Sequence, residues 1–163
     1  MADMDIRTSH RYAADPLTVH AMMVSPAWLE EVASRSAATS HRVEVSDAGT
    51  VLHLEVPAPP LATRFVGPTL TMTQEMVWSP PASDGSRLGS MRVTVAGAPA
   101  DIAGEATLRP SGDGATIVEY VGHVTISVPL FGRKLEEATA PYVQDALDAQ
   151  QAVGNDWLAR KAH

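Results

Sequence analysis

The sequence has no cysteine, which excludes disulfides, thiolate metal sites and cysteine nucleophiles. It also has no cluster of lysine and arginine, and its formal net charge is -7. Nucleic acids and anionic lipid surfaces both attract a basic face, so we expect neither nucleic-acid binding nor stable membrane association. No apolar run approaches the ~20 residues needed to span a bilayer. The first residues lack the apolar core of a signal peptide, and we therefore expect a cytoplasmic location.

The sequence motifs of several common enzyme classes are missing as well. There is no GxSxG nucleophile elbow, no GxxxxGK(S/T) phosphate loop and no GxGxxG dinucleotide fingerprint. The six histidines form no pair at helical i, i+4 spacing. We therefore expect no metal site and no cofactor.

The residues that are present have the composition of an ordinary globular protein, with 45% hydrophobic and 19% charged residues. A chain of 163 residues can bury a sizeable core, and we treat residues 1–163 as one domain. Apolar and polar residues alternate over 4–12 and over most of 41–128, which predicts antiparallel strands with one dry face.

Two short helices are predicted between the first strand and the others. Asp15-Pro16 and Ser25-Pro26 each combine a helix N-cap residue with proline at the first helical position. We expect the first of these helices to turn Leu17, Ala21 and Val24 inward.

The spacing of apolar residues changes to a period of 3.6 from Leu130 onward, which predicts a final helix of about 25–30 residues. Pro141 lies inside this helix and should kink it, because proline removes a backbone donor. We expect its outer face to be acidic, with Glu136, Glu137, Asp145 and Asp148.

The order of elements is one strand, two helices, about six strands and one long helix. This order predicts an α+β fold in which a curved antiparallel sheet of about seven strands wraps around the last helix. A strongly curved sheet leaves a space between itself and the helix, and such a space is often a ligand cavity.

Three segments carry a resemblance to a known group of proteins. They are RFVGPTLTMTQEMVW (64–78), GAPADIAGEATLRPSGDG (97–114) and VPLFGRKLEEATAPYVQDALDAQQAVGNDWL (128–158). The chain resembles an uncharacterised bacterial branch of the START and polyketide-cyclase superfamily, which includes the birch-pollen allergen. The resemblance covers essentially the whole chain and implies the helix-grip fold. It implies no single activity, because the superfamily includes lipid carriers, hormone receptors, cyclases and chaperone cofactors.

The strand TLTMTQEMVW (69–78) suggests where a ligand would bind. Its predicted inner side carries two methionines, a tryptophan and one glutamine. Methionine adapts to variable apolar guests, and an amide can orient a guest by hydrogen bonding. The same face could instead be solid core, with the amide satisfied by backbone or water. Taking the pocket hypothesis, the candidate site residues are His10, Tyr12, Leu54, Met72, Gln74, Met76, Trp78, Met91, Val93, Tyr120, Tyr142 and Leu147.

The leading hypothesis is therefore a protein that binds a small hydrophobic molecule such as a lipid, polyketide or isoprenoid. One alternative is a cyclase or aromatase that uses His10 and Tyr12 as acid and base, although no carboxylate falls clearly on the dry face. Another is an interaction module with a protein partner on the acidic face of the last helix. Association into a homodimer stays open.

The proline-rich segment 57–68, PAPPLATRFVGP, also has two interpretations. It could gate the mouth of a cavity, with Phe65 as a lid, or it could be a crossover between strands with Phe65 in the core.

Overall fold

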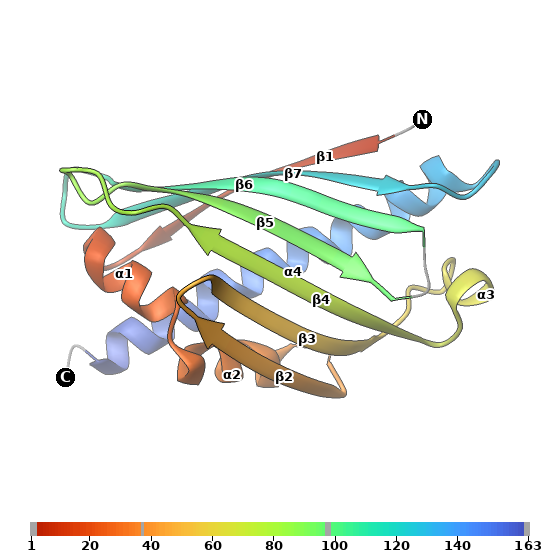
Figure 1. The fold of residues 1–163 in the computed structure, drawn as a ribbon, viewed down its shortest axis with the longest axis horizontal. Coiled ribbons are helices and arrows are strands. Elements are labelled where there is room, and N and C mark those ends of the chain that lie inside the picture. Colours follow the sequence, from red (N-terminus) through yellow and green to blue (C-terminus); the bar gives the residue numbers. More distant parts are fainter. Residues whose placement is uncertain (1–2, 37, 97–98, 162–163) are drawn as a thin grey trace.

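The computed structural model describes residues 3–36, 38–96 and 99–161. Seven strands form one antiparallel sheet in the order β1-β7-β6-β5-β4-β3-β2 (Figure 1). Their bounds are β1 Asp3–Tyr12, β2 Ser40–Ser46, β3 Gly49–Pro57, β4 Thr69–Trp78, β5 Arg87–Val95, β6 Ala100–Pro110 and β7 Thr116–Ile126. With a long C-terminal helix across the sheet, this architecture confirms the predicted α+β helix-grip fold.

Alternating burial along the strands explains why they form a sheet with one dry face. In β7, for example, Val118, Tyr120 and Val124 are buried, whereas Glu119 and His123 are exposed. The turns at 47–49 and 111–114 join neighbouring strands. Gly49, Gly112 and Gly114 have positive φ there, a conformation that glycine adopts without steric cost.

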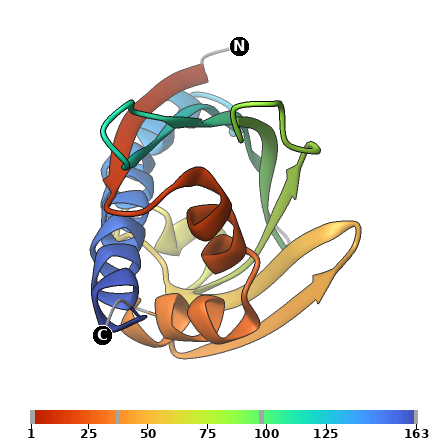
Figure 2. The same ribbon diagram turned by 90° about the vertical axis from the view of Figure 1, so that its left-hand side faces the viewer.

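Two short helices close one end of the curved sheet. Helix α1 (Pro16–Met23) and helix α2 (Pro26–Arg35) both begin with the predicted proline. Figure 2 shows α1 inside the ring made by the sheet and the last helix, with α2 along its edge. The inward face predicted for α1 is wrong: Leu17 is 69% exposed, and the buried residues are Pro16, Val19, Met22 and Met23.

The last helix, α4 (Gly132–Lys161), packs against β1, β7 and α2. Its side chains bind the free backbone edge of β1. The backbone nitrogen of Arg11 donates to Gln151 Oε1 over 2.7 Å, and that of Ala13 donates to Asn155 Oδ1 over 3.1 Å. Asn155 Nδ2 in turn donates to the Arg11 carbonyl over 2.9 Å. These bonds satisfy backbone groups at the C-terminal end of the β1 edge, where another chain could otherwise pair.

Two residues of α4 lie differently from the sequence prediction. Tyr142, expected in the interior, has an exposed fraction of 54%. Glu136, expected on the acidic outer face, is only 1% exposed, and its Oε2 accepts a 2.8 Å hydrogen bond from the backbone nitrogen of Ile126. The acidic face of α4 is therefore smaller than predicted. Helix α4 runs through Pro141 as one element of 30 residues.

The segment 57–68 contains one helical turn, α3 (Thr63–Val66), at the opposite end of the molecule from α1 (Figure 1). Phe65 is 39% exposed and tilts against Phe131, with ring centroids 5.7 Å apart. The Arg64 guanidinium lies over both rings, at 5.6 and 5.7 Å from their centroids. This cation–π contact connects α3 to the residues just before α4.

Among the described residues, no helix is both long and apolar enough to cross a membrane.

Candidate ligand-binding site

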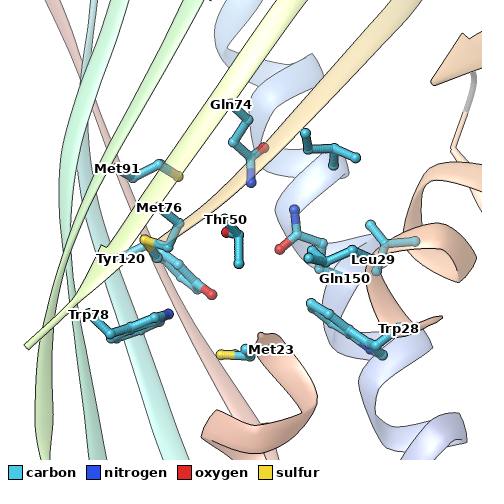
Figure 3. Close-up of a pocket in the computed structure, with 12 residues that line it drawn as sticks. Met23, Trp28, Leu29, Thr50, Gln74, Met76, Trp78, Met91, Tyr120 and Gln150 are labelled. Atoms are coloured by element: carbon cyan, nitrogen blue, oxygen red, sulfur yellow. The ribbon is translucent and has the colours of Figure 1, made fainter. Parts of the chain in front are cut away.

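A pocket lies between the concave face of the sheet, the α1–α2 pair and helix α4 (Figure 3). Strands β3, β4, β5 and β7 supply one wall, and the helices supply the other. The pocket is lined by Met23, Trp28, Leu29, Val32, Thr50, Leu52, Gln74, Met76, Trp78, Met91, Tyr120 and Gln150.

The structure brings together part of the predicted set of site residues. Those that line the pocket are Gln74, Met76, Trp78, Met91 and Tyr120. On β4, Gln74, Met76 and Trp78 share one face of the strand, as the alternation predicts. The strand Thr69–Trp78 therefore contributes its glutamine, one methionine and its tryptophan to a single wall.

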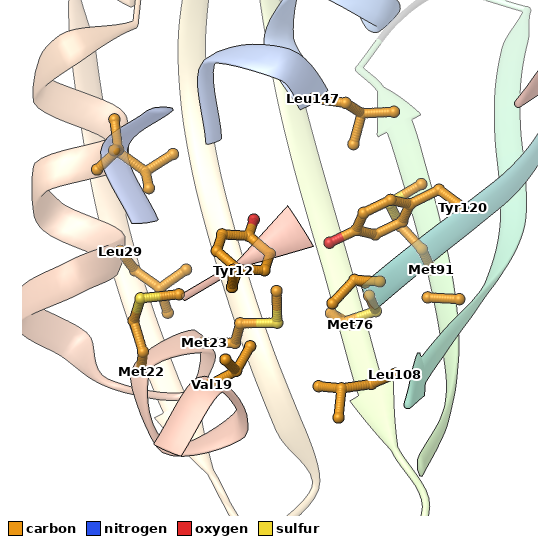
Figure 4. Close-up of a cluster of buried hydrophobic side chains, with 14 of the residues drawn as sticks. Tyr12, Val19, Met22, Met23, Leu29, Met76, Met91, Leu108, Tyr120 and Leu147 are labelled. Atoms are coloured by element: carbon orange, nitrogen blue, oxygen red, sulfur yellow. The ribbon is translucent and has the colours of Figure 1, made fainter. Parts of the chain in front are cut away.

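The other predicted residues lie outside the lining. Val93 and Leu147 are buried in the hydrophobic core, part of which Figure 4 shows. Leu54 and Met72 are opposite each other on β3 and β4, and both are only partly buried. Tyr142 is exposed, because the rotation of α4 turns it away from the sheet.

Several lining residues were not among the predicted site residues. They come from the helices and from β3, and they are Met23, Trp28, Leu29, Val32, Thr50, Leu52 and Gln150. The alternation of residues along β3 is compatible with an inward position for Leu52, and the 3.6-residue period of α4 with one for Gln150. The sequence has no signal that α1 and α2 fold over this part of the sheet, since that depends on how the short connections turn.

The pocket is narrow in the present conformation. Its core has a volume of about 30 Å³, and the surrounding hollow, counted out to solvent, has about 440 Å³ of space between atoms. The core has room for about 2 water molecules. A larger guest must displace side chains, and Met23, Met76 and Met91 are suited to this because methionine has several accessible rotamers.

His10 and Tyr12, the predicted acid and base, do not line the pocket. Both are buried, and the His10 ring is 5.3 Å from the Tyr120 ring and 6.2 Å from the Tyr12 ring, centroid to centroid. Tyr120 lines the pocket and neighbours His10 on the inner face of the sheet, but neither His10 nor Tyr12 is among the lining residues. The arrangement gives neither residue direct access to a guest in the pocket.

The buried position of these groups keeps them uncharged at neutral pH. Desolvation lowers the pKa of His10, although Asp148, whose Oδ1 lies 3.5 Å from His10 Nε2, opposes the shift. Burial raises the pKa of Tyr12, with a further contribution from Tyr120, and burial alone raises the pKa of Tyr120. Tyr120 therefore presents a neutral phenol to the pocket.

A second hollow lies open on the surface, with about 810 Å³ of space between atoms counted out to solvent, and it is lined by Ile126, Ser127, Val128, Pro129, Leu130, Gly132 and Arg133. None of the predicted site residues lines it. No group of three or more histidine, aspartate or glutamate side chains in the described parts of the chain is placed to hold a metal ion. No residue of 57–68 lines the pocket of Figure 3.

The family described as "Protein of unknown function (DUF2505)" matches residues 7–158. The chain belongs to this family. Among curated proteins, none matches the sequence. Membership in DUF2505 thus agrees with the resemblance to an uncharacterised branch found in the sequence.

Solved structures of several proteins share the fold. An aromatase/cyclase from a Streptomyces species is similar with a TM-score of 0.71 at 11% identity, covering 99% of this chain and 97% of its own. The norcoclaurine synthase of Thalictrum flavum gives 0.65 at 10% identity, covering 99% and 98%. A START superfamily protein from Mycobacterium smegmatis gives 0.57 at 11% identity, covering 94% and 98%. At these identities the likeness shows the fold alone, a START-like helix grip.

Proposed function

We propose that the protein binds a small, mainly hydrophobic molecule in the pocket between the sheet, α1–α2 and α4. The observation that carries this proposal is the composition of the lining. Three methionines and two tryptophans surround a space that also contains amide groups. A mainly apolar lining with a few directional polar groups is typical of small-molecule sites.

Two polar side chains in the lining favour a site for a guest over a core that is filled only by protein atoms. The two glutamines of the lining, Gln74 and Gln150, make no side-chain hydrogen bond to any described residue, although both are partly buried. Neither amide is among the side-chain groups that are fully buried without a partner, so both can still bond to water, and a guest that displaces this water has to replace its hydrogen bonds. A lipid, polyketide or isoprenoid-like molecule supplies the apolar surface that the methionines would cover.

The cyclase or aromatase alternative lacks a supporting contact. Its acid and base, His10 and Tyr12, are buried beside Tyr120 and do not line the pocket. The interaction-module alternative loses Glu136 from its acidic face, because this side chain is buried.

Native mass spectrometry of gently purified protein tests the binding proposal. We expect an additional mass that disappears on denaturation, and its value would identify the chemical class of the guest. The pocket-filling variant Gln150→Trp should lose this mass, whereas Ala149→Trp, at an exposed neighbouring position outside the lining, should keep it. A wild-type protein that carries no guest and binds no added apolar compound would overturn the proposal.

A further inference from the structure

The polar groups of the pocket restrict what kind of molecule fits it. Gln74 reaches in from β4 and Gln150 from α4, and Figure 3 shows both amides directed toward the same space, with Thr50 beside them. The hydroxyl of Tyr120 and the indole nitrogen of Trp78 also point into that space in Figure 3. Each amide can accept at its oxygen and donate from its nitrogen, while the indole can only donate.

The pocket lining contains no charged side chain. Its twelve residues include no aspartate, glutamate, lysine, arginine or histidine. His20 of α1 lies beside Trp78, with ring centroids 6.3 Å apart, and burial together with the charge of Arg87 lowers the pKa of His20, so it is neutral at pH 7. A charged guest would therefore give up water without meeting an opposite charge, which is strongly unfavourable in a narrow apolar space.

Uncharged polar oxygens are much better matched to these groups. A carbonyl oxygen can accept from either amide, from Trp78 or from Tyr120. A hydroxyl can in addition donate to an amide oxygen. Resting on the proposed binding function, we infer that the guest is uncharged and places a carbonyl or hydroxyl oxygen between Gln74 and Gln150. Its hydrocarbon part then lies against Met23, Met76 and Met91.

The inference distinguishes between classes of hydrophobic molecule. Ketones, alcohols and neutral polyketide-like or isoprenoid-like compounds satisfy both the amides and the methionines. Free fatty acids and anionic lipids do not, since their head groups find no cation among the lining residues. Pure hydrocarbons leave both amides unpaired, and a buried amide without a partner weakens binding.

Four probes that share one skeleton of heavy atoms test this inference. Acetophenone carries a carbonyl, 1-phenylethanol a hydroxyl, isopropylbenzene no polar group, and benzoate a negative charge at pH 7. Binding is followed by nuclear magnetic resonance of isotope-labelled methionine methyl groups. Met23, Met76 and Met91 report on the pocket, and Met22, buried but outside the lining, reports on the core.

We expect acetophenone and 1-phenylethanol to shift the three pocket methyls and to bind at least about tenfold more tightly than benzoate. Replacing Gln74→Leu or Gln150→Leu should weaken acetophenone binding about tenfold, in keeping with one lost hydrogen bond, without weakening isopropylbenzene. Gln144→Leu, on α4 but outside the lining, is the matched control and should change neither affinity.

The outcomes separate this inference from the function on which it rests. If none of the four probes shifts the pocket methyls, the binding function fails and this inference fails with it. If probes bind but benzoate binds as tightly as acetophenone, binding stands and the inference is overturned. The inference is also overturned if Gln74→Leu and Gln150→Leu both keep the wild-type preference for acetophenone over isopropylbenzene. The ranking of the probes needs only the unchanged protein, so it is informative even if a variant does not fold.

Discussion

Gly154 of α4 lies directly against the ring of Tyr12 on β1. A Cβ atom at this position would be 2.4 Å from Tyr12 Cε1 and 3.1 Å from Met22 Cε. Glycine inside a helix costs about 1 kcal/mol relative to alanine. In return, the helix backbone approaches the fully buried Tyr12 ring more closely than any larger residue would permit.

The variant Gly154→Ala should therefore destabilise the protein. The added methyl group must displace a buried ring, and overpacking of this kind costs typically about 1–3 kcal/mol, more than the gain in helix propensity. Urea unfolding measures the change. Gly122→Ala is the matched control, since its Cβ would meet only the Ala103 carbonyl oxygen at 3.6 Å, and it should have a much smaller effect. Equal stability of Gly154→Ala and wild type would contradict the close packing.

Tyr12→Phe should leave the stability unchanged or raise it, by up to about 1 kcal/mol. The Tyr12 hydroxyl is buried and has no hydrogen-bond partner among the described residues. Removing an unpaired buried polar group recovers its desolvation cost while the ring keeps its packing. Thermal and urea unfolding measure the effect. A clear loss of stability would instead show that the hydroxyl has a partner, such as a buried water molecule.

Glu136→Ala should lower the free energy of unfolding by about 1–3 kcal/mol, because the buried nitrogen of Ile126 loses its acceptor. Glu136→Gln keeps an acceptor oxygen for this bond and should cost less. The neighbouring Glu137 is exposed, so Glu137→Ala is the control and should stay within about 0.5 kcal/mol of wild type. If all three variants unfold at the same urea concentration, the bond to Ile126 contributes nothing.

Stability should fall as the pH is lowered through about 6.5. Burial lowers the pKa of His10 below its usual 6.5, so the unfolded chain takes up a proton in this range before the folded chain does. The facing groups are Asp148 on α4, Tyr12 on β1 and Tyr120 on β7, and only Asp148 opposes the shift.

The variant His10→Phe removes this proton uptake and should flatten the dependence of stability on pH below 6.5. His20 has a lowered pKa as well and contributes with the same sign, so His20→Gln should flatten it further. Urea midpoints measured between pH 5 and pH 8 give the slope. An unchanged slope in His10→Phe would show that His10 does not titrate differently in the two states.

The fold could be predicted from the sequence because its elements have strong local signals. Strict alternation identified the strands, and the prolines after Asp15 and Ser25 marked the starts of α1 and α2. The orientation of α1 was less predictable, since most residues of PLTVHAMM are apolar and the pattern gives no clear inward side. Glu136 was misplaced because a charged residue is usually exposed, and its partner is a backbone group that no side-chain pattern reveals.

The site was predictable only where it belongs to the sheet. The period of two placed Gln74 and Met76 on the inner face of β4, and both line the pocket. The contribution of Trp28 and Gln150 depends on how α2 and α4 pack over that face. Packing of this kind is determined by contacts between residues far apart in the sequence, and one sequence alone does not record them.

Strand β1 is synthesised before the other described elements, yet the partners that hold it are made last. Ile6 lies opposite Gly122 on β7, and the side chains that bind Arg11 and Ala13 come from residues 151 and 155 of α4. At a translation rate of about 5–20 residues per second, β1 waits on the order of ten seconds for β7 to be made. During that time the strand has an unpaired edge of the kind that aggregates or recruits chaperones. A ribosome-bound chain arrested before β7 should therefore remain open at this edge, and β1 is among the last of the described strands to be paired and packed.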